Sequence, residues 1–223
     1  MATQPDTPPL RADAERNRRR LLDAAAAAFA EHGLDVSVSE IARRAEVGKG
    51  TLFRRFPTKD DLIAAIVVDR FGGLVAEGKT LLDLDDAGAA LREWMAVCAR
   101  QQSEDRGLLA AVSGSALDNA GVQALHAEFL ELTHGLLERA QEAGAVRRDV
   151  TAVDIMLLSG SICEAAAKMH GLVPDLWRRY LDLALDGLRP AAAHPLSHPA
   201  PTLAQLEQAI EAKLREARHG RHA

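Results

Sequence analysis

The chain has 223 residues and is acidic, with 27 lysines and arginines against 32 aspartates and glutamates. Two cysteines are too few for a disulfide framework, and no apolar run approaches the roughly 20 residues of a membrane helix or resembles a signal peptide. Few aromatic residues and an excess of alanine, leucine, arginine and glutamate favour helices over sheets. We therefore expect a helical protein of the reducing cytoplasm.

In the N-terminal third, residues 1–12 are a predicted flexible arm. The sequence after this arm predicts four helices separated by tight turns. Gly33 is a natural stop for the first helix. Ser37 and Glu40 have the spacing of a capping box at the start of the second. Pro57 ends the third, and Thr58 caps the fourth. The predicted helices cover residues 13–32, 38–45, 49–56 and 58–71.

Positive charge is concentrated around the third of these helices. The window from Ile41 to Lys59 has one anion, Glu46, and six cations, which are Arg43, Arg44, Lys49, Arg54, Arg55 and Lys59. In an acidic chain, such a cluster indicates that a short helix contacts a polyanion. Leu52 and Phe56 lie four residues apart and are expected to face the core, so the opposite face of the helix points outward.

The remainder of the chain predicts a second helical domain and a tail. Gly72 and Gly73, followed by the acidic stretch 83–86, predict a break or hinge after the fourth helix. Residues 190–201 have the composition of a linker, and residues 203–217 form a possible tail helix with one apolar stripe. The five predicted helices of this domain cover residues 86–103, 106–116, 120–143, 151–170 and 174–188.

Residues 17–68 resemble the DNA-binding domain of the tetracycline-repressor (TetR) family of bacterial transcription regulators. The matching segments are Leu21–Ala25, Phe29–Gly33, Val38–Ala42, Val47–Phe56 and Lys59–Leu62. The resemblance implies an all-α fold of about nine core helices, with a three-helix helix-turn-helix domain (13–71) and a ligand-binding and dimerisation domain (72–189). Glu46 replaces the usual glycine of the turn, which predicts strain if φ is positive. Phe53 replaces the usual tyrosine and removes a possible phosphate contact.

The third helix is the predicted reader of DNA. Arg54 and Lys49 are the strongest candidates for base contacts, because arginine pairs well with guanine O6 and N7. Gly50 lets the helix approach the duplex closely. The resemblance adds further base or phosphate contacts, while Arg16 to Arg20 could reach flanking phosphates or form an ordinary solvated face. The predicted DNA-binding residues are Ser37, Ser39, Lys49, Gly50, Thr51, Phe53, Arg54, Arg55 and Lys59.

The resemblance also implies that the helices over residues 86–170 enclose a cavity for a small hydrophobic or amphipathic effector. Each candidate residue could instead be plain core. His126 and His134 lack further ligands at close spacing, so we predict no metal and no cofactor. The last two helices, which combine apolar and small residues, are the predicted homodimer interface. The candidate ligand-binding residues are Trp94, Met95, Cys98, Ser113, Phe129, Thr133, His134, Met156 and Cys163.

These patterns predict a sequence-specific transcriptional regulator, a ligand-responsive repressor that binds a pseudo-palindromic DNA operator as a dimer. A DNA-binding regulator without a ligand, and an activator, are the alternatives. The chain has no phosphate-cradling glycine loop, no HExxH and no GxSxG motif, so no catalytic residue is predicted. The sequence indicates neither the effector nor the operator.

Overall fold

In the computed structural model, the protein is described over residues 9–32, 36–104, 119–206, 208–209 and 212, and the regular elements of these ranges are all helical. The predicted all-α class is therefore confirmed. The helices are α1 (Pro9–His32), α2 (Val38–Arg44), α3 (Lys49–Arg55), α4 (Lys59–Leu81), α5 (Ala87–Glu104), α7 (Ala120–Glu142), α8 (Ala152–Ala167), α9 (Leu176–Gly187) and the short 3-10 helix η3 (Pro190–Ala192). The helix predicted over residues 106–116 lies outside the described residues.

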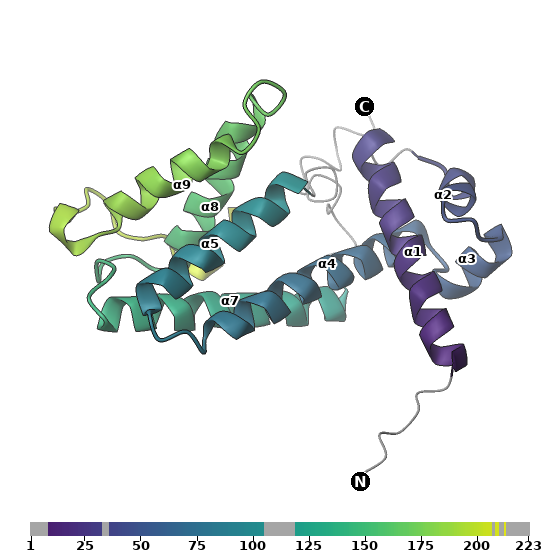
Figure 1. The fold of residues 1–223 in the computed structure, drawn as a ribbon, viewed down its shortest axis with the longest axis horizontal. Helices are drawn as coiled ribbons and strands as arrows, with labels where there is room; N and C mark the ends of the chain where they lie inside the picture. Colours follow the sequence, from purple (N-terminus) through teal and green to yellow (C-terminus); the bar gives the residue numbers. More distant parts are fainter. Residues whose placement is uncertain (1–8, 33–35, 105–118, 207, 210–211, 213–223) are drawn as a thin grey trace, which may run out of the picture.

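Two groups of helices are joined by α4. In Figure 1, α1, α2 and α3 lie at one end of the molecule, and α4 runs from them into a second group formed by α5, α7, α8 and α9. α7 runs alongside α4. Within the described ranges, no helix is both long and apolar enough to cross a membrane.

The first group has its own apolar core. Phe29 of α1, Ile41 of α2, Leu52 of α3 and Leu62 of α4 are all almost completely buried in it. Leu21, Leu22, Ala25 and Ala28 of α1 are buried as well, and this helix begins at Pro9, four residues earlier than predicted. Proline fits the first turn of a helix because its φ is already helical. Amides of the first turn have no acceptor within the helix, so the absence of an N–H costs no hydrogen bond there.

The break predicted at Gly72 and Gly73 is wrong, because α4 continues through both glycines to Leu81. Two glycines inside a helix cost roughly 1 kcal/mol each relative to alanine. Beyond them, Leu74, Val75 and Leu81 are buried in the second core. Burial of each such side chain is worth about 1.5–3 kcal/mol, which exceeds the cost of the glycines. Tertiary packing therefore overrides the local signal.

A third glycine of α4, Gly78, allows three helices to pack closely. A Cβ atom at this position would lie 2.3 Å from Cζ3 of Trp94 on α5 and 2.5 Å from Cδ2 of Leu132 on α7. Trp94 is held in place because its Nε1 donates to Oγ1 of Thr133 at 3.0 Å, and this hydroxyl donates to the carbonyl of Phe129. The second core is therefore built around the absence of a side chain at residue 78.

The segment after α9 is tied back to the body by a buried arginine. Arg147 donates to both carboxylate oxygens of Asp149, at 2.6 and 2.7 Å, and to the carbonyl of His194 at 2.6 Å. The hydrogen bond from Arg147 holds the pKa of Asp149 below its usual range. Further on, Thr202 and Gln205 exchange hydrogen bonds at the start of the tail helix, which begins at residue 203 as predicted.

We predict that Gly78→Ala lowers the free energy of unfolding by about 1–3 kcal/mol, the usual cost of an overpacked core. The matched control is Gly73→Ala in the same helix, where an added Cβ would meet no atom within 4 Å. The control is expected to raise the free energy of unfolding by about 0.5–1 kcal/mol, because alanine is the better helix former. Urea unfolding followed by circular dichroism measures both, and equal effects of the two substitutions would contradict this packing.

Candidate DNA interface and ligand cavity

The turn between α2 and α3 has the strain that the sequence predicted. Glu46 has a φ of 55°, in the left-handed region. Around it, the amide of Ala45 donates to Ile41 and the amide of Val47 donates to Ala42, which closes the end of α2. A residue with a Cβ pays about 1–2 kcal/mol for this conformation. The turn is held by its hydrogen bonds and by the core beneath it, in spite of the glutamate.

α3 presents one apolar face to the core and one polar face to solvent. Leu52 and Phe56 are buried, as the sequence predicted. Lys49, Thr51 and Arg54 are exposed on the other face. A Cβ at residue 50 would meet no atom within 4 Å, so internal packing does not explain the glycine there. The side chain of Arg54 lies along its own helix, with Nε donating to the carbonyl of residue 50 at 3.2 Å.

Phe53 is an unusual apolar member of this outer face. Its side chain is 49% exposed, beside exposed Arg54 and Arg55. An apolar ring that remains in water contributes little hydrophobic free energy to folding. Single exposed apolar side chains are common on protein surfaces, so the predicted DNA contact of Phe53 stays a prediction.

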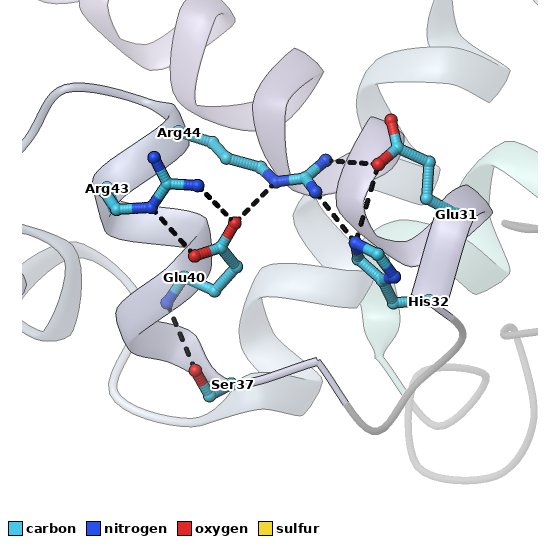
Figure 2. Close-up of polar contacts among 6 residues, drawn as sticks. All are labelled: Glu31, His32, Ser37, Glu40, Arg43 and Arg44. Carbon is cyan, nitrogen blue, oxygen red and sulfur yellow. Dashed lines mark hydrogen bonds and ion pairs between the residues drawn. The ribbon is translucent and has the colours of Figure 1, made fainter.

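The start of α2 is only partly as predicted. Oγ of Ser37 accepts a hydrogen bond from the amide of Glu40 at 3.2 Å. The carboxylate of Glu40 does not complete the predicted capping box, since it accepts hydrogen bonds from Arg43 and Arg44 instead (Figure 2). Two charged donors compensate a carboxylate better than one backbone amide does.

The same contacts fix the charge of Glu40. Hydrogen bonds from Arg43 first, and then from Arg44, lower the pKa of Glu40 from 4.5 to about 2. Because the pKa is lower in the folded state, the pairing stabilises the fold fully above pH 4.5, and this contribution is lost as the pH falls through 2. At neutral pH, Glu40 therefore stays charged beside both arginines.

Arg44 also joins α2 to α1. Its Nη1 donates to Glu31 at 2.7 Å, and its Nη2 lies 2.8 Å from Nε2 of His32 (Figure 2). Two of the six cations that the sequence placed near DNA, Arg43 and Arg44, are thus paired with carboxylates of their own domain. The positive charge on the outer face of α3 comes from Lys49, Arg54 and Arg55.

Lys59 has a structural partner that the sequence did not predict. Its Nζ donates to the carbonyl of Val36 at 2.9 Å and lies 5.7 Å from the centre of the Phe29 ring. These contacts attach the start of α4 to the segment that leads into α2. Its predicted phosphate contact stays a prediction, as do those of Ser37 and Ser39, both of which are exposed at the start of α2.

The second group of helices encloses a cavity of about 170 Å³. Five of the predicted ligand-binding residues border it, and they are Trp94, Cys98, Phe129, Thr133 and Met156. Met95 and Cys163 are buried beside it in the core, and the Cys163 thiol lies 3.5 Å from the carbonyl of Ala99. His134 is exposed on another side of α7, near Glu138. Ser113 lies outside the described residues.

Sequence reasoning missed the contribution of α4 to the cavity. Val67, Arg70, Phe71 and Leu74 border it, at the i, i+3, i+4, i+7 spacing of one helix face. The fourth helix was expected to end before Gly72, so this face was assigned to the first domain alone. Continuing the apolar pattern across the glycines would have found it. The other unpredicted lining residues are Gln101, Gln102, His126, Ile155 and Ser159.

Most of the cavity wall is apolar. The ring centres of Phe71 and Phe129 are 6.0 Å apart, and those of Phe129 and Trp94 are 5.1 Å apart, so aromatic rings connect α4, α7 and α5. Burial raises the pKa of the Cys98 thiol, which keeps it neutral. No group of three metal-ligating side chains occurs in the described part of the chain. This wall suits a mostly apolar molecule with a few polar atoms.

The helix-turn-helix and the helical body behind it define a class of bacterial DNA-binding regulators. The model of the tetR family of bacterial regulatory proteins matches residues 21–66, and the model of the SbtR-like transcriptional regulator C-terminal domain matches residues 86–190. The crystal structure of a TetR transcription regulatory protein from Mycobacterium vanbaalenii is 38% identical, covers 81% of this chain and 99% of its own, and has a TM-score of 0.62. The chain belongs to the TetR family.

Two sequence relatives agree with this assignment. An uncharacterised HTH-type transcriptional regulator of Mycobacterium bovis is 33% identical over 133 residues, which are 57% of this chain and 68% of the relative. The A-factor receptor protein of Streptomyces griseus is 29% identical over 221 residues, which are 90% of this chain and 75% of the relative. DNA binding and regulation of transcription are thus the general activity of the protein.

We predict that Glu46→Gly raises the free energy of unfolding by about 1 kcal/mol, because glycine adopts a positive φ without a Cβ clash. Glu46→Ala is the matched control, since it removes the same charge but keeps the Cβ. The control is expected to leave stability nearly unchanged. Thermal unfolding of both variants measures the difference, and an equal gain in the two would assign the effect to charge instead of strain.

Proposed function

We propose that the protein is a ligand-responsive repressor that binds a pseudo-palindromic operator as a homodimer. The observation that carries this proposal is the position of α4. Leu62 and Ile66 of this helix are buried in the DNA-binding domain, and Leu74 and Val75 are buried in the second core. Its middle borders the cavity. A molecule in the cavity therefore contacts the helix that supports α3.

The exposed face of α3 is the proposed reader of the operator. A recognition helix needs a buried back and a polar front that reaches base edges in the major groove. Leu52 and Phe56 form the back, while Lys49 and Arg54 stand at the front. Gly50 leaves room for a close approach of the duplex. Thr51, Phe53 and Arg55 complete the proposed contacts from this helix.

The outer surface of α8 and α9 is the proposed dimer interface. Some of the apolar residues of these two helices face inward, since Ile155 and Ile162 of α8 are buried in the subunit core. Other apolar residues remain on the outside, among them Leu157 and Leu183, which are 43% and 56% exposed. A two-fold axis at this surface would place two recognition helices on one face of the DNA, which doubles the number of base contacts.

The coupling between cavity and DNA is a difference in affinity between two conformations. A ligand shifts the equilibrium only by the difference between its binding free energies for the two states. A ligand in the cavity contacts the middle of α4. We propose that this contact stabilises one orientation of α3 relative to another. The A-factor receptor protein, whose name describes a receptor, supports an effector-binding role for this cavity. In this proposal, ligand binding releases the operator and thereby lifts repression.

We predict that Arg54→Ala weakens binding to the selected operator by about 1–3 kcal/mol and relaxes one base position in each half-site. The operator is obtained by selection from a random DNA pool and is expected to have half-sites about 34–36 Å apart, or a multiple of this. The control is Arg55→Ala, which removes a neighbouring cation of the same helix and should weaken operator and scrambled DNA alike. An equal loss on both DNAs for Arg54→Ala would refute base reading.

We predict that Met156→Trp blocks the cavity and abolishes the response to ligand. Met156 borders the cavity from α8 and is only half-buried, so a larger side chain fits with less strain there than at a fully buried position. A thermal-shift screen of small apolar and amphipathic compounds identifies ligands of the wild type, since binding to the native state raises its stability. The variant should bind the operator normally and keep it when such a compound is added. Normal release by the variant would contradict the assignment of this cavity.

A further inference from the structure

Arg70 connects the cavity to the first helix of the DNA-binding domain. Arg70 borders the cavity from α4. Its Nη2 donates to Oδ1 of Asp23 on α1 at 3.0 Å. The side chains of Arg70 and Asp23 are 36% and 52% exposed, so this ion pair lies at the edge of the cavity, within reach of solvent.

Such an ion pair is easily exchanged for another. An exposed pair of this kind contributes little to stability, because water competes for both charges. If another anion binds the guanidinium of Arg70, the carboxylate of Asp23 can hydrogen-bond to water instead. The cost is small because the Asp23 side chain is half exposed. An anion at the mouth of an apolar cavity is less hydrated than Asp23, and its hydrogen bonds to Arg70 are correspondingly stronger.

We propose that the effector is an amphipathic acid whose anionic head group takes Arg70 from Asp23 and thereby releases α1 from α4. The inference rests on the proposed ligand response and names its chemical class. The apolar body of the effector lies against Phe71, Trp94 and Phe129, and the acid group lies beside Arg70. The amides of Gln101 and Gln102, which also border the cavity, can donate to the same group.

A second ion pair between the same two helices provides the control. Arg18 of α1 donates to Asp69 of α4 at 3.2 Å, and these side chains are 26% and 17% exposed. Neither residue borders the cavity. Asp69→Asn therefore weakens the connection between α1 and α4 without changing the charge that faces the ligand. A general loosening of α1 and a specific loss of acid recognition can thus be distinguished.

The test compares decanoate with 1-decanol, which have the same chain and differ in the charge of the head group. Binding is measured below the micelle concentration by the change in fluorescence of Trp94, which borders the cavity. The wild type is expected to bind decanoate about ten-fold more tightly than decanol, the factor that corresponds to one charged hydrogen-bonding contact at a half-exposed site. Arg70→Gln should abolish this preference, and Asp69→Asn should retain it.

Asp23→Asn keeps the proposal testable if Arg70→Gln folds poorly. This variant removes the competing carboxylate and leaves Arg70 in place, so decanoate should bind several-fold more tightly than to the wild type. Decanoate should also release the operator from the wild type at lower concentrations than decanol does.

The following results would overturn the inference. The wild type could bind neither compound, or both equally. A preference for decanoate could survive in Arg70→Gln and disappear in His126→Gln, which would assign the acid to the histidine at the cavity. Asp23→Asn could fail to strengthen decanoate binding. If both compounds bind equally and release the operator, the effector is not an acid, but the proposed function is supported. If decanoate binds in an Arg70-dependent way without releasing the operator, the proposed ligand response is wrong.

Discussion

The contact of α4 with Trp94 and Leu132 at Gly78 is the constraint on which the arrangement of the two domains depends. It brings α4 so close to α5 and α7 that no side chain fits at residue 78. The far end of α4 is thereby fixed in the second core, and its near end carries Leu62 into the core of the DNA-binding domain. α4 therefore connects the core that holds α3 to the packing around Gly78 in the second core.

Charge in the DNA-binding domain has two separate uses. Arg44 joins α2 to α1 through Glu31 and Glu40, and Arg18 joins α1 to α4 through Asp69. These arginines position helices, although a count of cations along the sequence assigns them to DNA. Of the exposed cations on the outer face of α3, Lys49 and Arg54 make no ion pair with an acid among the described contacts. Counting cations along the sequence therefore overestimates the positive charge that faces outward from this domain.

Local signals predicted most of the first domain, and long-range packing decided the rest. The spacing of Leu52 and Phe56 gave the buried face of α3, and the glutamate at position 46 indicated the strained turn, because each feature depends only on nearby residues. The path of α4 through Gly72 and Gly73 depends instead on burial against α5 and α7, which no local pattern records. Since the cavity is built on that path, sequence reasoning found walls on α5, α7 and α8 but missed the wall on α4.

α4 is not the only helix shared by the two cores. The first turn of α7 is capped by Asn119, and Val122 in that turn is buried in the core of the DNA-binding domain, whereas Leu136 further along is buried in the second core. Both helices border the cavity. A molecule between α4 and α7 therefore contacts two helices that both extend into the core of the DNA-binding domain. In that core, Val68 of α4 lies beside the start of α7. A small change in the distance between α4 and α7 changes the packing of side chains in that core. Because packed interiors change between discrete arrangements and do not deform continuously, even a small change can move the core to another arrangement.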